Sequence, residues 1–190
     1  MNSAPARLNA DLIQQVIQSF PCDGGWQELA CSILRPDRAA KRSWTSVSAE
    51  LSGQAGLYAF LFPRTQFSRT FTFELDGPAK RKIPFGFCVE DLPVVAKDYF
   101  VAYVGRSANL LQRLQWHFQS WEESTAAQVR KALIRCGYVR SVEEAVDFMI
   151  QHGKVVYRRM PGDENVANRD IIEVALWATY RCPFNIKSER

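Results

Sequence analysis

The sequence predicts a mixed α/β protein, and two patterns carry that prediction. Short runs rich in aromatic and β-branched residues, near 56–62, 99–105 and 154–160, are typical of strands. Between and after them lie longer stretches whose apolar residues recur at helical spacing. A chain of 190 residues fits one domain that can bury a substantial core. We therefore expect a small sheet flanked by helices.

The N-terminal part of the chain reads as a helical extension followed by a basic connector. Apolar residues at helical spacing predict helices over 8–20 and 26–34. The stretch that follows is rich in Arg, Lys and Ser and has little periodicity, which is typical of an exposed connector. We therefore assign the extension and connector to 1–53 and the main domain to 54–190.

An inserted β-hairpin is predicted between the first two strands, at about 63–98. Two alternating runs, 71–75 and 83–89, are separated by a turn sequence that begins at Asp76. Lys80, Arg81 and Lys82 follow that turn, so the tip of the hairpin should be positively charged.

The segment after the second strand combines several side chains that can bind a phosphate. Gly105 should end the strand that carries Tyr103, and Ser107 can cap the helix that follows. Arg113 and His117 are four residues apart and hence neighbours on one flank of that helix, at the edge of the core. The buried stripe of the helix should consist of Leu110, Leu111, Leu114, Phe118 and Trp121.

Three more helices are predicted in the remainder of the chain. They cover 125–136, 142–151 and 167–180, and the second is preceded by Ser141 as N-cap and followed by Gly153.

Composition bounds the class of protein. The net charge is +4, which is compatible with a polyanionic partner without being evidence for one. Five scattered cysteines without a C-x-x-C pair suggest neither a disulfide framework nor a zinc site. No apolar run approaches the roughly 20 residues that a bilayer span needs, and no signal peptide is evident. We expect a cytoplasmic protein with no membrane association and no small-molecule cofactor.

Several residues in the expected order resemble the motifs of the GIY-YIG nuclease family. Gly56-Leu57-Tyr58 and Tyr103-Val104-Gly105 lie on the first two predicted strands, with Leu57 and Val104 in place of isoleucines. The residues that complete the resemblance, which covers about 56–185, are Arg113 and His117 on the next helix, Glu173 in the last helix and Asn185 after Pro183. The insertion at 63–98 is longer than in compact members.

The resemblance implies both a fold and an activity. Members are α/β sandwiches around a three-stranded antiparallel sheet, which the three predicted strands would supply. They hydrolyse DNA phosphodiester bonds with one divalent metal ion. The sequence is therefore expected to encode a DNA endonuclease that uses Mg²⁺ or Mn²⁺.

Each residue then has an expected role. Glu173 would hold the metal, because a hard cation prefers oxygen ligands, and Arg113 would neutralise a phosphate oxygen. Tyr58 would act on the attacking water, with His117 as acceptor of its proton. Tyr103 would position water or phosphate. The remaining expected contacts are Asn185 for local geometry and Arg106, Arg64, Lys80, Arg81 and Lys82 for DNA.

Alternatives remain open at this stage. Asp170, one turn before Glu173, could be the metal ligand, and Asn185 could simply be part of a turn. The chain could be a catalytically inactive nucleic-acid-binding module or a protein-interaction domain. Among nucleases, a stand-alone site-specific restriction enzyme fits the length best, with a repair or mobile-element enzyme as alternatives. A homodimer could form through the two N-terminal helices, which could instead merely cover the sheet.

Overall fold

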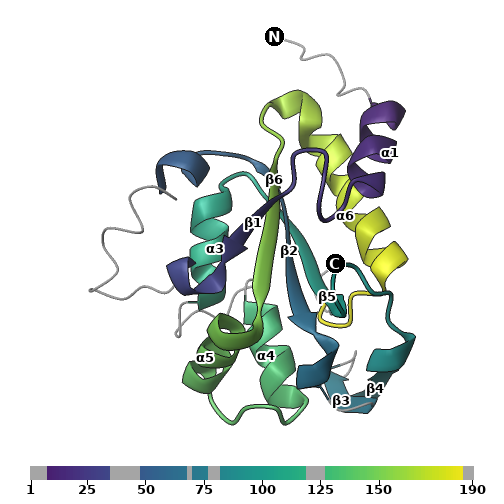
Figure 1. Ribbon diagram of the computed structural model, residues 1–190, viewed down its shortest axis with the longest axis vertical. Coiled ribbons are helices and arrows are strands. Elements are labelled where there is room, and N and C mark those ends of the chain that lie inside the picture. The colour runs from purple at the N-terminus through teal and green to yellow at the C-terminus, as the bar shows by residue number, and fades with distance from the viewer. Residues whose placement is uncertain (1–7, 35–47, 68–69, 77–81, 119–126, 186–190) are drawn as a thin grey trace.

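The computed structural model describes residues 8–34, 48–67, 70–76, 82–118 and 127–185. It is a mixed α/β fold, as predicted, in which helices cover both faces of one central sheet (Figure 1). Among these residues, none of the helices has the length and apolar character that crossing a membrane would require.

The central sheet has four antiparallel strands in the order β1-β6-β2-β5. Strand β2 (Gly56–Pro63) is buried up to Phe62 and lies between β6 (Lys154–Arg159) and β5 (Tyr99–Ser107). These are the three strands that the sequence predicts. The expectation of a three-stranded sheet is nevertheless wrong, because β1 (Gln27–Ala30) pairs with the free edge of β6.

The fourth strand arises where a helix is expected over 26–34. The segment instead forms β1 and a short 3-10 helix, η1 (Cys31–Leu34). The run is too short for its apolar spacing to distinguish helix from strand. Pairing of Glu28 with Val156 on β6 decides the outcome, since it satisfies backbone groups that would otherwise form an open sheet edge.

Within the described residues, five longer helices form the two outer layers. Helices α3 (Leu110–Phe118), α4 (Gln128–Arg135) and α5 (Val142–His152) lie on one side of the sheet. Helices α1 (Ala10–Gln18) and α6 (Val166–Tyr180) lie against each other on the other side, as Figure 1 shows. The predicted helix at the N-terminus is thus present, and its apolar side packs within the chain.

Alternation along the strands divides the core between the two faces. In β2, Tyr58 and Phe60 point toward α3, whereas Leu57, Ala59 and Leu61 pack with residues of α1 and α6. The candidate functional residues of the sheet therefore lie on the face that α3 covers.

A β-bulge interrupts the pairing of β2 with β5 and changes the direction of one side chain. Phe60 pairs with Tyr103 but Leu61 pairs with Val101, so Ala102 is an extra residue on β5. Without it, Tyr103 would lie on the same face as Val101, because residues two apart share a face. The bulge brings Tyr103 to the face that carries Tyr58.

The predicted hairpin is present as a separate two-stranded sheet of β3 (Thr70–Asp76) and β4 (Lys82–Cys88). Phe71 and Phe87 stack with ring centroids 4.6 Å apart, and Phe71 lies 4.9 Å from Tyr138. Aromatic contacts thus attach the hairpin to the main body.

Helix α5 begins as predicted, because Ser141 accepts a hydrogen bond from the backbone N–H of Glu144 at 3.2 Å. Helix α3 does not. Strand β5 continues to Ser107, which pairs with Gly56, and the side chain of Asn109 caps the helix by accepting from Gln112 N–H. The prediction of Ser107 as the cap is therefore wrong, because strand pairing extends two residues past Gly105.

Candidate active site

The hydroxyl of Tyr58 lies at the centre of the candidate site. It is 2.9 Å from Nε2 of His117 and accepts a hydrogen bond from Nε of Arg113 at 3.2 Å. Tyr58 comes from β2 and the other two from α3, where their spacing of one turn lets both reach the same oxygen. The structure thus brings these three predicted residues together.

Burial keeps the central pair neutral. It raises the pKa of Tyr58 well above 10.0, and Tyr103 adds to this rise while the charge of Arg113 opposes it. Burial, followed by the charges of Arg113 and Arg130, lowers the pKa of His117 well below 6.5. At neutral pH we therefore expect a neutral phenol beside a neutral imidazole.

The hydrogen bonds indicate where the protons lie. Arg113 can only donate, so the Tyr58 hydroxyl is free to donate its proton to Nε2 of His117. That arrangement places the imidazole proton on Nδ1, which is buried and has no hydrogen-bond partner among the residues that the structure describes. The pair is thus oriented to pass a proton from Tyr58 to His117.

His117 is fully buried, although the sequence predicts it at the edge of the core. Its ring lies 4.7 Å from that of Phe60 and 5.4 Å from that of Tyr103, so the sheet face closes over it. Arg130 of α4, also buried, adds positive charge nearby. Sequence reasoning missed Arg130; its position beside Val129, at the border of the apolar side of α4, was the available signal.

Gly105 allows the two tyrosines to approach. An added Cβ there would lie 2.5 Å from Cζ and Oη of Tyr58 and 2.9 Å from Cε1 of Tyr103. Gly56 is equally constrained, since its Cβ would lie 2.1 Å from the carbonyl oxygen of Arg158. At both positions, Gly56 and Gly105, steric crowding therefore favours a residue without a side chain.

Asn185 holds the strand that carries Tyr103. Its Oδ1 accepts from the backbone N–H of Val104 at 2.7 Å, and its Nδ2 donates to the Val104 carbonyl at 2.6 Å. The preceding Phe184 N–H donates to the carbonyl of the bulged Ala102. Because β5 is an edge strand, these bonds replace a missing neighbour.

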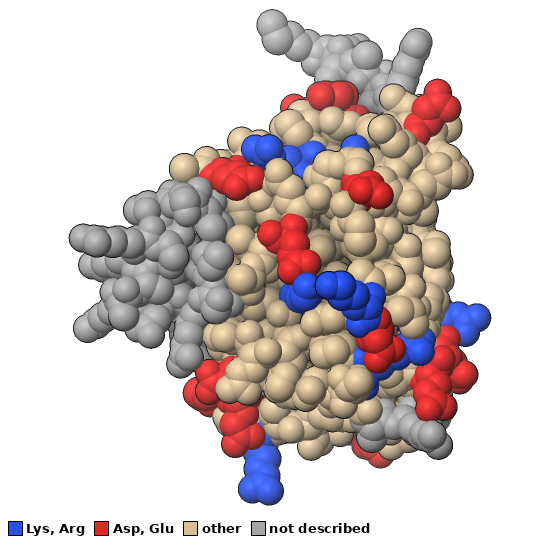
Figure 2. Space-filling view, viewed as in Figure 1, with Lys and Arg blue, Asp and Glu red and all other residues tan. Residues whose placement is uncertain are grey.

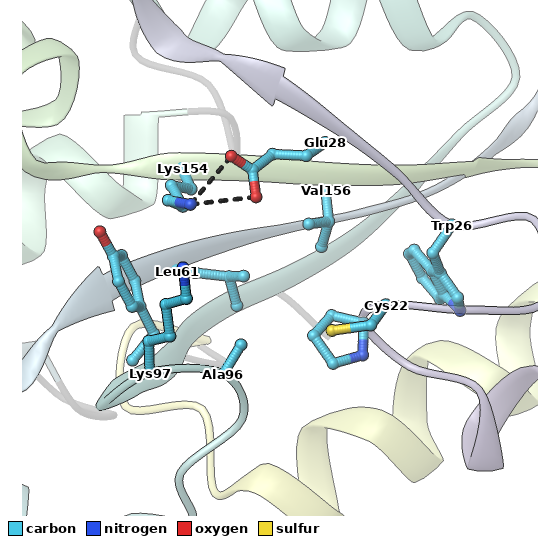
Figure 3. Close-up of a pocket in the computed structure, with 10 residues that line it drawn as sticks. Cys22, Trp26, Glu28, Leu61, Ala96, Lys97, Lys154 and Val156 are labelled. Carbon is cyan, nitrogen blue, oxygen red and sulfur yellow. Dashed lines mark hydrogen bonds and ion pairs between the residues drawn. The ribbon is translucent and has the colours of Figure 1, made fainter.

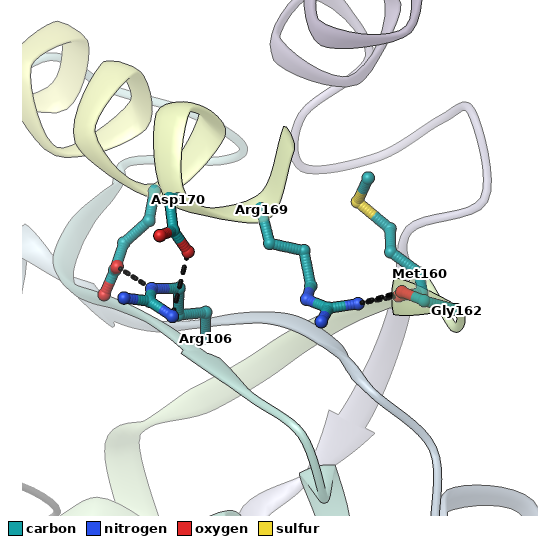
Figure 4. Close-up of polar contacts among 6 residues, drawn as sticks. Arg106, Met160, Gly162, Arg169 and Asp170 are labelled. Carbon is teal, nitrogen blue, oxygen red and sulfur yellow. Dashed lines mark hydrogen bonds and ion pairs between the residues drawn. The ribbon is translucent and has the colours of Figure 1, made fainter. Parts of the chain in front are cut away.

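Glu173 and Arg106 extend the site around the β5 edge. Nε of Arg106 is 3.0 Å from Oε2 of Glu173, and Nη1 is 2.8 Å from Oδ1 of Asp170. Figure 4 shows Arg106 reaching from the strand toward Asp170 on α6. Burial raises the pKa of Tyr103, Arg113 opposes the rise, and the Glu173 charge adds to it, so this carboxylate lies within electrostatic range of Tyr103.

The donors present fit a hard divalent cation. The part of the chain that the structure describes contains no group of three or more His, Cys, Asp and Glu side chains suited to a metal ion. Glu173 and Asp170 nevertheless offer carboxylate oxygens on one side of α6, and Mg²⁺ is commonly held by one or two carboxylates plus waters. Glu173 is the better candidate because it lies close enough to Tyr103 for its charge to raise the pKa of that phenol.

No family model, curated protein or solved structure matches this chain. The resemblance to GIY-YIG nucleases thus rests on the residues of the chain itself.

Among the residues expected to contact DNA, Arg106 lies at the site, whereas Arg64 has other contacts. Arg64 donates to the carbonyls of Leu92 and Glu90, so it holds the segment before β5. Lys80 and Arg81 lie outside the described residues, as does the part of the connector at 35–47, and only the backbone of Lys82 is described. On the face seen in Figure 2, positive and negative side chains are interspersed.

A cavity of about 230 Å³ lies at the opposite end of the sheet, lined in part by Trp26, Leu61 and Tyr99. Lys154 and Glu28 form an ion pair at its rim, with Nζ–Oε distances of 2.9 and 3.1 Å (Figure 3). Neither Tyr58 nor Tyr103 lines this cavity, which is smaller than most ligand pockets.

Proposed function

We propose that the chain is a divalent-metal-dependent endonuclease of the GIY-YIG type that hydrolyses phosphodiester bonds in DNA. The observation that carries the proposal is the position of the Tyr58 hydroxyl between Nε2 of His117 and Nε of Arg113. A buried phenol between a proton acceptor and a guanidinium is suited to activate water beside a phosphate.

In the proposed reaction, a water oxygen forms a bond to phosphorus while the bond from phosphorus to the leaving oxygen breaks. The proton of the water passes to the Tyr58 oxygen as the phenol proton passes to Nε2 of His117. The pKa shifts oppose a preformed phenolate, so a concerted relay fits this pair better than stepwise ionisation. The leaving oxygen takes its proton from solvent.

The charged residues support this step from two sides. Arg113 stabilises negative charge on the Tyr58 oxygen and on a non-bridging phosphate oxygen. A Mg²⁺ or Mn²⁺ ion held by Glu173 would supply positive charge to the phosphate and the leaving oxygen. Asn185 acts through β5, because it keeps Tyr103 and Gly105 in register.

The first test is cleavage of supercoiled plasmid and of linear duplexes by the purified chain. We expect nicks or breaks with Mg²⁺ or Mn²⁺ and none with EDTA. If DNA is bound but never cut across a broad screen of substrates and metals, the chain is a nucleic-acid-binding module instead.

Substitutions then test the assigned roles. Tyr58→Phe and Arg113→Ala should each slow cleavage at least about a hundredfold, and Glu173→Ala should remove metal-dependent turnover. Tyr157→Phe is the matched control, because its hydroxyl lies on the same sheet face but donates to Glu50 at 2.6 Å. Equal rates for Tyr58→Phe and Tyr157→Phe would contradict the proposal.

A further inference from the structure

Arg106 forms an ion pair with Glu173, whose carboxylate the proposed metal site requires. Its guanidinium contacts Glu173 at 3.0 Å through Nε and Asp170 at 2.8 Å through Nη1. One cation thus connects two carboxylates on the same side of α6. The Glu173 side chain is 17% exposed, so its interaction with Arg106 is partly shielded from solvent.

We propose that Arg106 and a divalent cation compete for Glu173, and that the displaced guanidinium becomes a phosphate contact. The phosphate half of this proposal rests on the proposed nuclease function. The competition itself involves only the protein and the metal ion, so it can be measured without DNA.

Charge and geometry support the competition. A divalent ion on Glu173 would lie a few ångströms from the guanidinium, and like charges repel more strongly as their distance falls. Arg106 can respond, because its side chain is 38% exposed and follows Gly105 at the end of the strand. Asp170, 44% exposed, can keep the guanidinium nearby when Glu173 is taken.

A neighbouring arginine is held in another place. Arg169 precedes Asp170 on α6, but its Nη1 donates to the carbonyl oxygens of Met160 and Gly162 (Figure 4). It is buried, and those contacts hold its guanidinium against the carbonyl oxygens that follow β6. Removing Arg106 should therefore remove the guanidinium that contacts both carboxylates.

The exchange would couple the two ligands. If a DNA phosphate attracts Arg106, Glu173 is released for the metal, and metal on Glu173 releases Arg106 for the phosphate. By thermodynamic linkage, each ligand then tightens the binding of the other by the same factor. Arg106 is on this account a positioning residue that makes a filled metal site and a bound phosphate occur together.

The test is Mn²⁺ binding to the full chain without DNA, followed by electron paramagnetic resonance of free Mn²⁺. Arg106→Met, which keeps most of the aliphatic stem, should bind Mn²⁺ about three- to tenfold more tightly than the parent. Arg106→Lys should show a smaller gain, because a point charge cannot contact both carboxylates through a planar fork. Glu173→Ala should abolish the gain in the Arg106→Met background.

Arg140→Ala is the charge-matched control, since Arg140 lies in the connection before α5 and is exposed. It lowers the net charge equally and should leave Mn²⁺ affinity at the parental value. Unchanged or weaker affinity in Arg106→Met, an equal gain in Arg140→Ala, or the absence of saturable Mn²⁺ binding would each overturn the competition.

A second titration separates this proposal from the nuclease function. A duplex with hydrolysis-resistant phosphorothioate linkages should tighten Mn²⁺ binding by the parent but not by Arg106→Met. If the parent cleaves DNA but Arg106→Met binds Mn²⁺ no more tightly, the nuclease function stands and the proposed exchange is wrong. If Arg106→Met binds Mn²⁺ more tightly but the parent never cleaves DNA, the exchange stands and the nuclease function is wrong.

Discussion

At the scale of single residues, the feature with most consequence is a buried, neutral tyrosine–histidine pair. Burial opposes the charged form of both side chains, so it raises the pKa of Tyr58 and lowers that of His117. Both shifts oppose transfer of the proton in the free protein. Under the proposed function, transfer would therefore need charge that arrives with the substrate or the metal, and base activity would be restricted to the loaded site.

The lowered pKa of His117 makes the free energy of unfolding depend on pH in the acid range. The unfolded chain protonates His117 near the ordinary value of 6.5, whereas the folded protein does so only at a much lower pH. Below pH 6.5 the unfolded state binds more protons, so the free energy of unfolding falls as pH falls. His117→Phe should flatten this dependence by up to about 1.4 kcal/mol per pH unit.

Urea unfolding between pH 7.5 and about 5 measures that difference. His152→Phe, which replaces the other histidine of the chain, is the control for the loss of an imidazole. If the free energy of unfolding depends on pH equally in the parent and in His117→Phe, the folded state does not lower the pKa of His117.

At the scale of elements, the edge strand β5 is shaped by the segment that follows α6. The bulge at Ala102 directs Tyr103 toward Tyr58, and the bulged carbonyl accepts from Phe184 N–H. Asn185 then pairs both backbone groups of Val104. The order of the site thus depends on contacts between segments about 80 residues apart in sequence.

Asn185→Ala should weaken this edge. It removes two partly buried hydrogen bonds from an edge strand, so the free energy of unfolding should fall by about 1–3 kcal/mol. Cleavage should slow by more than the loss of folded protein explains, because Tyr103 loses its register. Unfolding in urea and single-turnover cleavage at a temperature where the variant stays folded measure the two effects. Parental values for both would assign Asn185 to a simple turn.

At the scale of the whole molecule, the N-terminal segment is part of the sheet and its outer layer. Strand β1 completes the central sheet, and Leu12, Ile13 and Ile17 of α1 pack against the core that α6 covers. Trp26 is buried and donates from Nε1 to the carbonyl of Val16 at 3.2 Å. The apolar side of α1 is therefore used within the chain, which favours the expectation that this segment covers the sheet.

Removal of residues 1–34 should therefore damage the fold. It would leave the edge of β6 unpaired and expose apolar side chains of β2 and β6, so we expect aggregation or loss of a cooperative transition. In the full chain, Trp26→Ala should lower the free energy of unfolding by about 3–5 kcal/mol. Sedimentation and urea unfolding check both. A truncated chain that unfolds at the parental urea concentration would show that the extension is independent of the domain.

The sequence alone determined the elements whose patterns are long or strongly alternating. Strands β2, β5 and β6, the hairpin and helices α3 to α6 follow from local spacing of apolar residues, because burial of one side is encoded within each stretch. The same reading singled out Tyr58, Arg113 and His117, since neighbours one turn apart on a helix share a flank.

The tertiary structure decided what depends on distant partners. The conversion of Gln27–Ala30 into a strand depends on the open edge of β6, and the face of Tyr103 depends on a bulge that spacing does not reveal. The full burial of His117 and the contact of Arg106 with Glu173 arise where separate elements meet. A short stretch carries its own periodicity, but the identity of the surface that will cover it is set by chain segments far away in sequence.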